Sequence, residues 1–572
     1  MESAFEVYRK KLKQKSPEKT KRKKASSIKK KKNVIQKPKV NLKTKQFLLD
    51  YAQSSNTNEF QCANGKLEDE PMLLPQEEIL PANNIQKSKP KKKKKGKLDD
   101  FSSQNIQHLI DSSLNTSSDE SVSLEEPEKV FQWLISPRLP RDFFNTIWEK
   151  VAIHIKRNHE NVYQELLTTN KLQSIFLDNV LFYTRNVDVV SYTNDKRETH
   201  NVEGRAVPAA LWDYYKNGCS IRILNPHTYC TKLHSLLSTL QEYFGCMVGV
   251  NAYLTPPGSQ GFAPHYDDIE AFVLQLEGRK HWKLYAPLTS SEVLPRYSSR
   301  NFNRDELKGK PVKEVTLEEG DLLYFPRGTI HEGFTDPEAH SLHITISVYQ
   351  KTSYVDLMEH VLKYTLSAAA SDDVEFREGL PLQYLQHCGF ANDDCDSKMR
   401  MTLKKKVKRL LTKMIDHLDI DSAADELGKQ FMWDSMPPIP TKNEREHMMI
   451  LNGEKIDKGK IYDKIDFNLN VEVRLLRYHC MRLVNDRSED SLKIYYNTDN
   501  ANYYHGEELQ FLVIDYMYED AIKCLIHAYP NYVQIGKLPL DGDSDKIQIV
   551  SDLWEKGLLV TRYPLSYNSE ES

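Results

Sequence analysis

Apolar and polar residues alternate along four short stretches in the middle of the chain, at residues 248–255, 272–276, 280–285 and 342–349. This period of two is typical of strands that bury one face. The residues Glu277-Gly278-Arg279 separate the second and third stretches and predict a turn, so we expect a hairpin there.

Stretches with apolar residues three and four positions apart flank these strands and predict amphipathic helices. We expect helix throughout residues 130–176, a transition into strands at 175–177 and 180–183, and helices at 208–215, 233–244, 354–362 and 401–418. A proline-rich linker at 437–440 comes next. Beyond residue 456, a strand at 471–478, helices at 509–528 and 546–556, and a closing segment at 557–561 predict a winged-helix fold.

The formal net charge of −2 hides a strong asymmetry along the 572 residues. Residues 1–100 hold 27 Lys and Arg against 12 Asp and Glu, a charge of +15, and the remainder therefore carries −17. Runs of like charge repel one another and do not pack, so we expect residues 1–127 to be a disordered basic arm. Such an arm is suited to contacts with RNA or import receptors, and a solvated tail is the plainer alternative.

The cysteines and the apolar runs limit the class of protein. Eight cysteines are scattered without a Cys-x-x-Cys pair, which argues against a thiolate zinc site and favours free thiols in a reducing compartment. No apolar run approaches a membrane-spanning length, so we expect a soluble intracellular protein without membrane contact.

The candidate chemistry lies at His265 and Asp267, two positions apart on a segment interpreted as extended, where alternate side chains share a face. His331 follows the sequence Pro326-Arg327-Gly328 and supplies a third candidate ligand. Two histidines and one carboxylate on one face of an octahedral ion form the non-haem Fe(II) oxygenase arrangement. A His-x-Asp pair alone is weak evidence, because surface and core pairs of this kind are common.

Lys280 strengthens the metal interpretation, because the expected hairpin returns it towards the candidate ligands. A cation at that position can hold the distal carboxylate of a 2-oxo acid by a charge-assisted hydrogen bond. His343 falls on the last expected strand and is interpreted as lining the pocket without binding the metal. His281 is expected to face away from the metal, and His340 to lie in a turn with Asp336 and Pro337.

Residues 251–261, the stretch from Ala263 to Lys280 and the stretch from Tyr324 to His331 resemble the Jumonji C (JmjC) family of 2-oxoglutarate oxygenases, in its ribosomal oxygenase branch. The resemblance covers roughly residues 130–570. It implies a mostly β catalytic core, a cupin-like double-stranded β-helix with flanking helices, followed by a helical dimerisation domain and a winged-helix domain. It also implies Fe(II), 2-oxoglutarate and O2, with Asn251, Tyr253 and Ser347 beside Lys280 as cosubstrate-binding residues. Barrel lining is the plainer role for the first two.

The resemblance implies two reactions at one iron: hydroxylation of a histidine in a large-subunit ribosomal protein, and demethylation of methylated lysines on histone H3. It further implies a homodimer, residence in the nucleoplasm and nucleolus, and roles in ribosome biogenesis and transcription repression. No aromatic cage for a methylammonium is evident, which favours hydroxylation. A catalytically silent chromatin-associated repressor is the alternative from another class.

The expected domains are the basic arm at 1–127, the JmjC domain at 128–350, the helical domain at 351–455 and the winged-helix domain at 456–572. The apolar stripe formed by Leu403, Val407, Leu410 and Met414 predicts a helix that packs either on the barrel or on a second copy of the chain.

Overall fold

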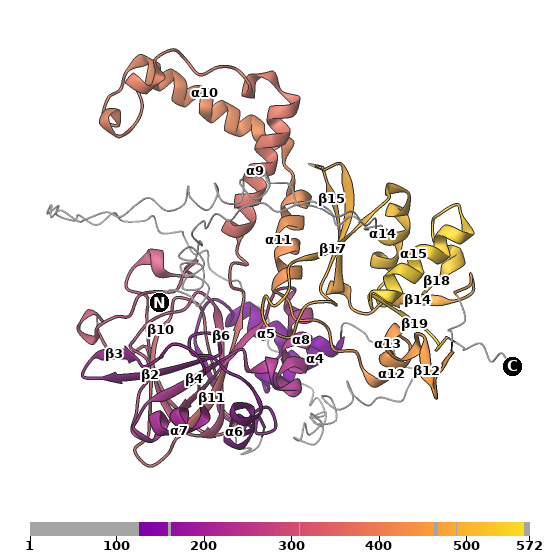
Figure 1. Cartoon of the computed structure of the whole chain (residues 1–572). Coiled ribbons are helices and arrows are strands. Elements are labelled where there is room, and N and C mark those ends of the chain that lie inside the picture. Colours follow the sequence, from indigo (N-terminus) through magenta and orange to yellow (C-terminus); the bar gives the residue numbers. More distant parts are fainter. Residues whose placement is uncertain (1–124, 158–161, 308, 463–466, 488, 566–572) are drawn as a thin grey trace, which may run out of the picture. The chain divides into compact units, whose positions relative to one another are not determined.

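A computed structural model describes residues 125–565, except for 158–161, 308, 463–466 and 488 (Figure 1). The predicted basic arm lies outside the described residues, apart from its last three positions. In the described part of the chain, no helix is both long and apolar enough to cross a membrane.

An eight-stranded sheet forms the larger half of the N-terminal domain, with strand order β1-β9-β6-β11-β5-β4-β2-β3 and antiparallel neighbours throughout. The strands are β1 (Ile153–Ile155), β2 (Val187–Thr193), β3 (Lys196–Thr199), β4 (Ser220–Leu224), β5 (Gly249–Thr255), β6 (Glu270–Gly278), β9 (Leu322–Phe325) and β11 (Ser341–Val348). A three-stranded sheet faces it, with β7 (Lys280–Tyr285) between β10 (Ile330–Thr335) and β8 (Lys313–Leu317).

Helices cover the outer face of the large sheet. They are α4 (Glu125–Ile135), α5 (Pro140–Thr146), α6 (Thr169–Asp178), α7 (Pro208–Lys216) and α8 (Thr231–Phe244), and Figure 1 shows α4, α5 and α8 gathered on one side of the strands. Alternate residues of β5 and β11, such as Leu254 and Ile344, pack against them in the main apolar core. The intervening residues of the same strands therefore face the interior between the two sheets.

The expectation of helix throughout residues 130–176 is wrong, because β1 interrupts it. This three-residue strand pairs with β9, and the carboxylate of Asp321 accepts hydrogen bonds from the His154 ring at 2.8 Å and the Arg157 amide at 2.9 Å. Residues 175–177 belong to α6 and do not lead directly into a strand. A strand this short is fixed by its partner rather than by its own pattern.

The expected hairpin at Gly278 is also wrong in its pairing. The turn is where the sequence placed it, but β6 belongs to the large sheet and β7 to the small one, so the chain crosses between sheets. Gly278 has a φ of +65°, and a Cβ there would lie 1.9 Å from the carbonyl oxygen of His340. Only glycine fits this crossing.

A helical arm follows the barrel and consists of α9 (Tyr354–Asp372), α10 (Lys398–Met414) and α11 (Ile420–Asp434). The two expected helices are thus confirmed, and α9 is longer than its pattern indicated. Helix α9 packs on α11, whereas α10 stands out with the loop before it in Figure 1.

The C-terminal part has its own apolar core, which includes Trp554 and Leu553. Its main elements are β14 (Glu472–Leu475), β15 (Met481–Asp486), β16 (Ser491–Tyr496), β17 (Gln510–Ile514), α14 (Glu519–Ala528), β18 (Val533–Gln534), α15 (Asp543–Glu555) and β19 (Leu559–Thr561). Shorter elements precede them, namely α12 (Lys442–Glu446), α13 (Met449–Asn452), β12 (Lys455–Asp457) and β13 (Lys460–Tyr462). The predicted helix at 509–528 is wrong over its first part, where β17 pairs with β16.

Candidate active site

His265 and His331 are brought together by the backbone. The amide of His331 donates to the carbonyl of His265 at 2.8 Å, and the amide of His265 donates in return to the carbonyl of His331 at 3.2 Å. This isolated bridge lies before β6 and at the start of β10. His265 is therefore not on the regular strand that the sequence predicted. The predicted convergence of the three residues holds even though its predicted local cause does not.

The side chains of His265, Asp267 and His331 converge on one point. Their ligand atoms all lie within 4.8 Å of one another. The Nε2 atoms of His265 and His331 lie 3.8 Å and 3.7 Å from the carboxylate oxygens of Asp267. In each ring, Nδ1 is hydrogen-bonded to a backbone carbonyl two residues earlier, at 2.8 Å to Ala263 and 3.0 Å to Thr329. These bonds place the proton on Nδ1 and leave both Nε2 lone pairs directed at the carboxylate, as metal binding requires.

The surroundings of His265 favour its neutral form. Burial and the neighbouring His331 lower the pKa of His265 to about 4. A histidine must be neutral to bind a metal, so His265 is ready as a ligand at neutral pH.

Gly328 holds the two ligand segments in register. Its amide donates to the carbonyl of Asp267 at 3.1 Å, beside the His265–His331 bridge. With a φ of +86°, a Cβ at this position would lie 2.2 Å from the carbonyl oxygen of Glu292. The glycine after Pro326 and Arg327 is therefore required by geometry, which explains the sequence before His331.

Lys280 lies inside the barrel and is 5% exposed. Its Nζ donates to the hydroxyl of Thr255 at 3.2 Å. Burial lowers the pKa of Lys280 to about 7. A buried ammonium with one neutral partner is well suited to receive a carboxylate, because the charge lacks a counter-ion there.

Asn251 and Tyr253 lie on the interior face of β5, as expected, and their neighbours Val250, Ala252 and Leu254 face the helices. Ser347 shares the interior parity on β11 and is paired with Gly249. The Tyr253 hydroxyl interacts with Arg222, whose guanidinium also binds Asp188 at 3.0 Å. Sequence reasoning missed Arg222, Asp188 and Thr255, although the alternation along β4 and β5 was the signal that could have found them.

His281 lies away from the triad, as expected, and His340 does so too. His281 lies on the outer side of the small sheet, where Thr316 is 2.6 Å from its Nδ1, and His340 contacts Glu277 at 3.2 Å. His343 lies inside the barrel, with its ring stacked on Tyr253 at 4.8 Å.

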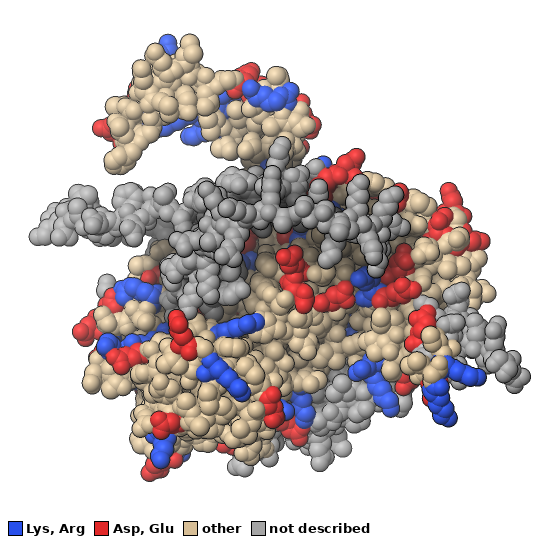
Figure 2. Space-filling view, viewed as in Figure 1, with Lys and Arg blue, Asp and Glu red and all other residues tan. Residues whose placement is uncertain are grey.

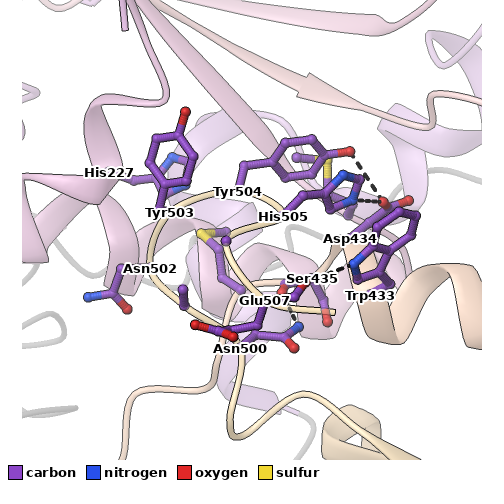
Figure 3. Close-up of a pocket in the computed structure, with 14 residues that line it drawn as sticks. His227, Trp433, Asp434, Ser435, Asn500, Asn502, Tyr503, Tyr504, His505 and Glu507 are labelled. Atoms are coloured by element: carbon purple, nitrogen blue, oxygen red, sulfur yellow. Dashed lines mark hydrogen bonds and ion pairs between the residues drawn. The ribbon is translucent and has the colours of Figure 1, made fainter. Parts of the chain in front are cut away.

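Two cavities lie outside the triad. A cleft of about 1040 Å³ runs between the β2–β3 hairpin, the loop at Gly258–Gln260 and the outer face of β7 and β10. The loop at Gly258–Gln260 thus lines a cleft beside Glu332, the residue after His331. The second cavity, shown in Figure 3, is only about 10 Å³ and is walled by the stacked rings of Trp433, His505 and Tyr504. It is barely large enough for one water molecule.

Comparison with known proteins gives the family. A family profile described as "JmjC domain" matches residues 222–357, and one described as "Ribosomal oxygenase 1, C-terminal winged helix domain" matches residues 436–565. Ribosomal oxygenase 1 of Gallus gallus is 45% identical over 438 residues, which are 76% of this chain and 72% of that protein. The chain belongs to the ribosomal oxygenase family.

A second relative agrees with this assignment. A bifunctional lysine-specific demethylase and histidyl-hydroxylase of Culex quinquefasciatus is 46% identical over 442 residues, 77% of this chain and 67% of that protein. A solved ribosomal oxygenase from Escherichia coli, in complex with cobalt and 2-oxoglutarate, is 15% identical over 74% of this chain and 97% of its own, with a TM-score of 0.39.

Membership confirms the predicted fold class, with its cupin-like JmjC core, flanking helices and C-terminal winged helix. The chain is a 2-oxoglutarate-dependent dioxygenase that uses Fe(II), 2-oxoglutarate and O2. The residues fit these groups, because two Nε2 atoms and a carboxylate converge at one point and the buried Lys280 ammonium has a neutral hydrogen-bond partner, the Thr255 hydroxyl. The predicted domain boundaries stay predictions.

Removal of a triad side chain is expected to weaken metal binding. Asp267→Ala and His331→Ala should each lower the affinity for Co(II), a redox-stable substitute for Fe(II), by more than the roughly 10–100-fold that loss of an outer partner costs. Isothermal titration of the metal-free protein measures this directly. His281→Ala, which removes an imidazole on the outer side of β7, is the matched control and should leave affinity unchanged. Unchanged Co(II) binding by His331→Ala would return His340 and His343 to consideration as ligands.

Proposed function

We propose that this enzyme hydroxylates a histidine of a large-subunit ribosomal protein, with Fe(II) held by His265, Asp267 and His331. The convergence of the three ligand atoms carries this proposal, because a 2-His-1-carboxylate set leaves open positions for cosubstrate and O2. When bound, iron with 2-oxoglutarate and O2 supplies an oxidant that places one oxygen atom into a C–H bond, and succinate and CO2 are released.

The chain's own residues position the reactants. Lys280 binds the distal carboxylate of 2-oxoglutarate, while Asn251, Tyr253 and Ser347 line the path between it and the metal. The hydrogen bonds from Nδ1 of His265 and His331 fix both rings, so both Nε2 atoms would be held in place for the metal.

The charge near the triad favours a neutral imidazole over a cationic methyllysine. The rings of Phe262 and His265 have centroids 6.1 Å apart. The guanidinium groups of Arg197 and Arg222 lie over the ring of Phe262, at 4.6 Å and 5.5 Å from its centroid. The ring is therefore already occupied by cations and does not offer a methylammonium site. Burial and the neighbouring Arg222 lower the pKa of Arg197 to about 10, which leaves it cationic at neutral pH.

Lysine demethylation on histone H3 is the second candidate, because relatives carry both activities in their names. The decisive test incubates enzyme, Fe(II), 2-oxoglutarate and O2 with large-subunit ribosomal proteins and, separately, with methylated H3 peptides. We expect mass spectrometry to find one added oxygen on a histidine, and no such product with Asp267→Ala. Loss of a methyl group with release of formaldehyde would instead establish demethylation, and neither product from the iron-loaded protein would favour the silent repressor.

The basic arm is proposed to bind import receptors or RNA and so to direct the protein to the nucleus and nucleolus. There the protein would act in ribosome biogenesis and transcription repression. The support for this proposal is the charge of +15 over residues 1–100.

The winged-helix domain is proposed as a protein-interaction module, because its acidic residues around α15 do not suit a nucleic-acid groove.

The binding of 2-oxoglutarate is expected to weaken as pH rises through about 7. Lys280 with a pKa of about 7 carries its charge below that pH and loses it above, so a carboxylate binds with uptake of a proton at higher pH. With one linked proton, affinity should fall towards about tenfold per pH unit on the alkaline side. Calorimetric titration of the Mn(II)-loaded protein from pH 6 to 9 measures this. Lys280→Arg keeps its charge over that range and should give a flatter profile; equal slopes would show that Lys280 is not the titrating group.

The helical arm is proposed to form a homodimer. It exposes many large apolar side chains, including Phe390, Leu382, Val407 and Leu411 at 94%, 89%, 44% and 53%. Of the predicted stripe, Met414 is buried within the arm, while Leu403 and Leu410 are partly covered. In Figure 2 much of the surface over this arm is neither acidic nor basic. Several exposed large apolar side chains on one arm are typical of a protein–protein interface.

Charges on the exposed apolar side of α10 are expected to produce a monomer. Val407→Glu with Leu411→Glu places two carboxylates on the proposed interface, where their desolvation opposes association. Thr402→Glu with Thr412→Glu adds the same charge to the same helix on its polar side and should stay dimeric. Light scattering gives the mass of each, and a wild-type mass for the first pair would refute the interface.

A further inference from the structure

Three buried polar atoms of the barrel interior have no partner among the residues that the structure describes, namely Nδ1 of His343, Nε1 of Trp282 and Oε1 of Gln275. The side chain of His343 is 2% exposed and lies on the interior face of β11, directly opposite Tyr253 of β5. Buried polar atoms are nearly always paired, so an unpaired one in the barrel interior requires an explanation.

The ring of His343 is held in one orientation by its neighbours. It stacks on Tyr253 with centroids 4.8 Å apart and planes 3° from parallel, and it meets the edge of Trp282 at 5.3 Å and 81°. Contacts on both a face and an edge leave the imidazole little freedom to turn. Burial and the nearby charge of Lys280 hold its pKa well below the ordinary value, so the ring is neutral and carries a single N–H.

His343 lies close both to Lys280 and to the triad residue His331, and the charge of each acts on its ring. Tyr253, on which the ring stacks, is two residues along β5 from Thr255, whose hydroxyl accepts the hydrogen bond from Lys280. The ring of Trp282 is 5.3 Å from His343 and 6.1 Å from His331. His343 is therefore near both groups that 2-oxoglutarate would join if Lys280 held its distal carboxylate.

We infer that His343 is a positioning residue for the cosubstrate, and that its Nδ1–H donates a hydrogen bond to the distal carboxylate of 2-oxoglutarate beside the Lys280 ammonium. This inference rests on the proposed role of Lys280. A carboxylate has two oxygens with several acceptor sites, so it accepts from both donors at once. Its negative charge also selects the Nδ1–H tautomer of a ring that packing has already oriented.

A purely structural role for His343 is the alternative, in which the ring only fills space between Tyr253 and Trp282. The two roles differ in what they require of the side chain. A filler needs volume, whereas a donor needs an N–H at the Nδ1 position. Asn places its amide nitrogen near that position, Gln places it near Nε2, and Leu keeps apolar volume without any donor.

The test compares His343→Asn, His343→Gln and His343→Leu in the full chain, with Lys280→Met beside them. Calorimetry measures the affinity of the Mn(II)-loaded proteins for 2-oxoglutarate, and also for 2-oxobutyrate, which lacks the distal carboxylate. We expect His343→Leu to weaken 2-oxoglutarate by about tenfold or more, as loss of a hydrogen bond to a charged group does. His343→Asn should stay within a few-fold of wild type, and His343→Gln should resemble His343→Leu. Affinity for 2-oxobutyrate and for Mn(II) should change little in all three.

The outcomes separate the two levels of the hypothesis. If Lys280→Met leaves 2-oxoglutarate binding intact, the proposed cosubstrate site itself is wrong. If Lys280→Met weakens binding while His343→Leu and His343→Asn are equal, or while 2-oxobutyrate loses as much as 2-oxoglutarate, only the role of His343 is overturned. A lower unfolding temperature of His343→Leu would not affect the comparison of Asn with Gln, which differ in where the donor lies.

Discussion

The antiparallel bridge between His265 and His331 is the contact on which the site depends. Its two backbone hydrogen bonds, at 2.8 Å and 3.2 Å, join a segment before β6 to the start of β10 and so tie the large sheet to the small one. Because backbone atoms make the bridge, the positions of both imidazoles follow from chain geometry and not from side-chain packing. The carbonyls that fix Nδ1 come from the same two segments, which makes the ring orientation a further consequence of the bridge.

The alternation of side chains along β5 and β11 separates stability from chemistry. One face of each strand contributes only apolar residues to the core beneath the helices, and the other presents Asn251, Tyr253, His343 and Ser347 to the interior. The period of two therefore allows one sheet to pack on α4, α5 and α8 while it carries polar groups on its opposite face.

Much of the site could be predicted from the sequence, and the misses have physical causes. His265, Asp267, His331 and Lys280 were found because residue type and order carry the signal. The bridge pairing could not be found, because a contact across 66 positions leaves no local pattern. The same limit hid β1, whose three residues become a strand only against β9, and it made the chain crossing at Gly278 resemble a hairpin.

Apolar runs caused the remaining errors in the C-terminal part. The run at Gln510–Ile514 precedes a true helix without a strong break, so periodicity alone could not distinguish a strand from the first turns of that helix. Pairing with β16 decides the outcome.

Burying polar groups in the barrel interior lowers the stability of the fold, and the rest of the domain must offset this cost in free energy. Lys280 is buried beside one hydroxyl, Nδ1 of His343 is unpaired, and Arg197 and Arg222 both lie over Phe262. A buried polar group that stays unsatisfied costs roughly 1–3 kcal/mol. The aromatic cluster on the opposite face of the large sheet supplies compensating burial, with Phe131, Phe143, Phe272 and Tyr324 in mutual contact. The helical layer therefore does more than enclose the sheet, because its apolar core offsets the cost of keeping polar groups on the opposite face.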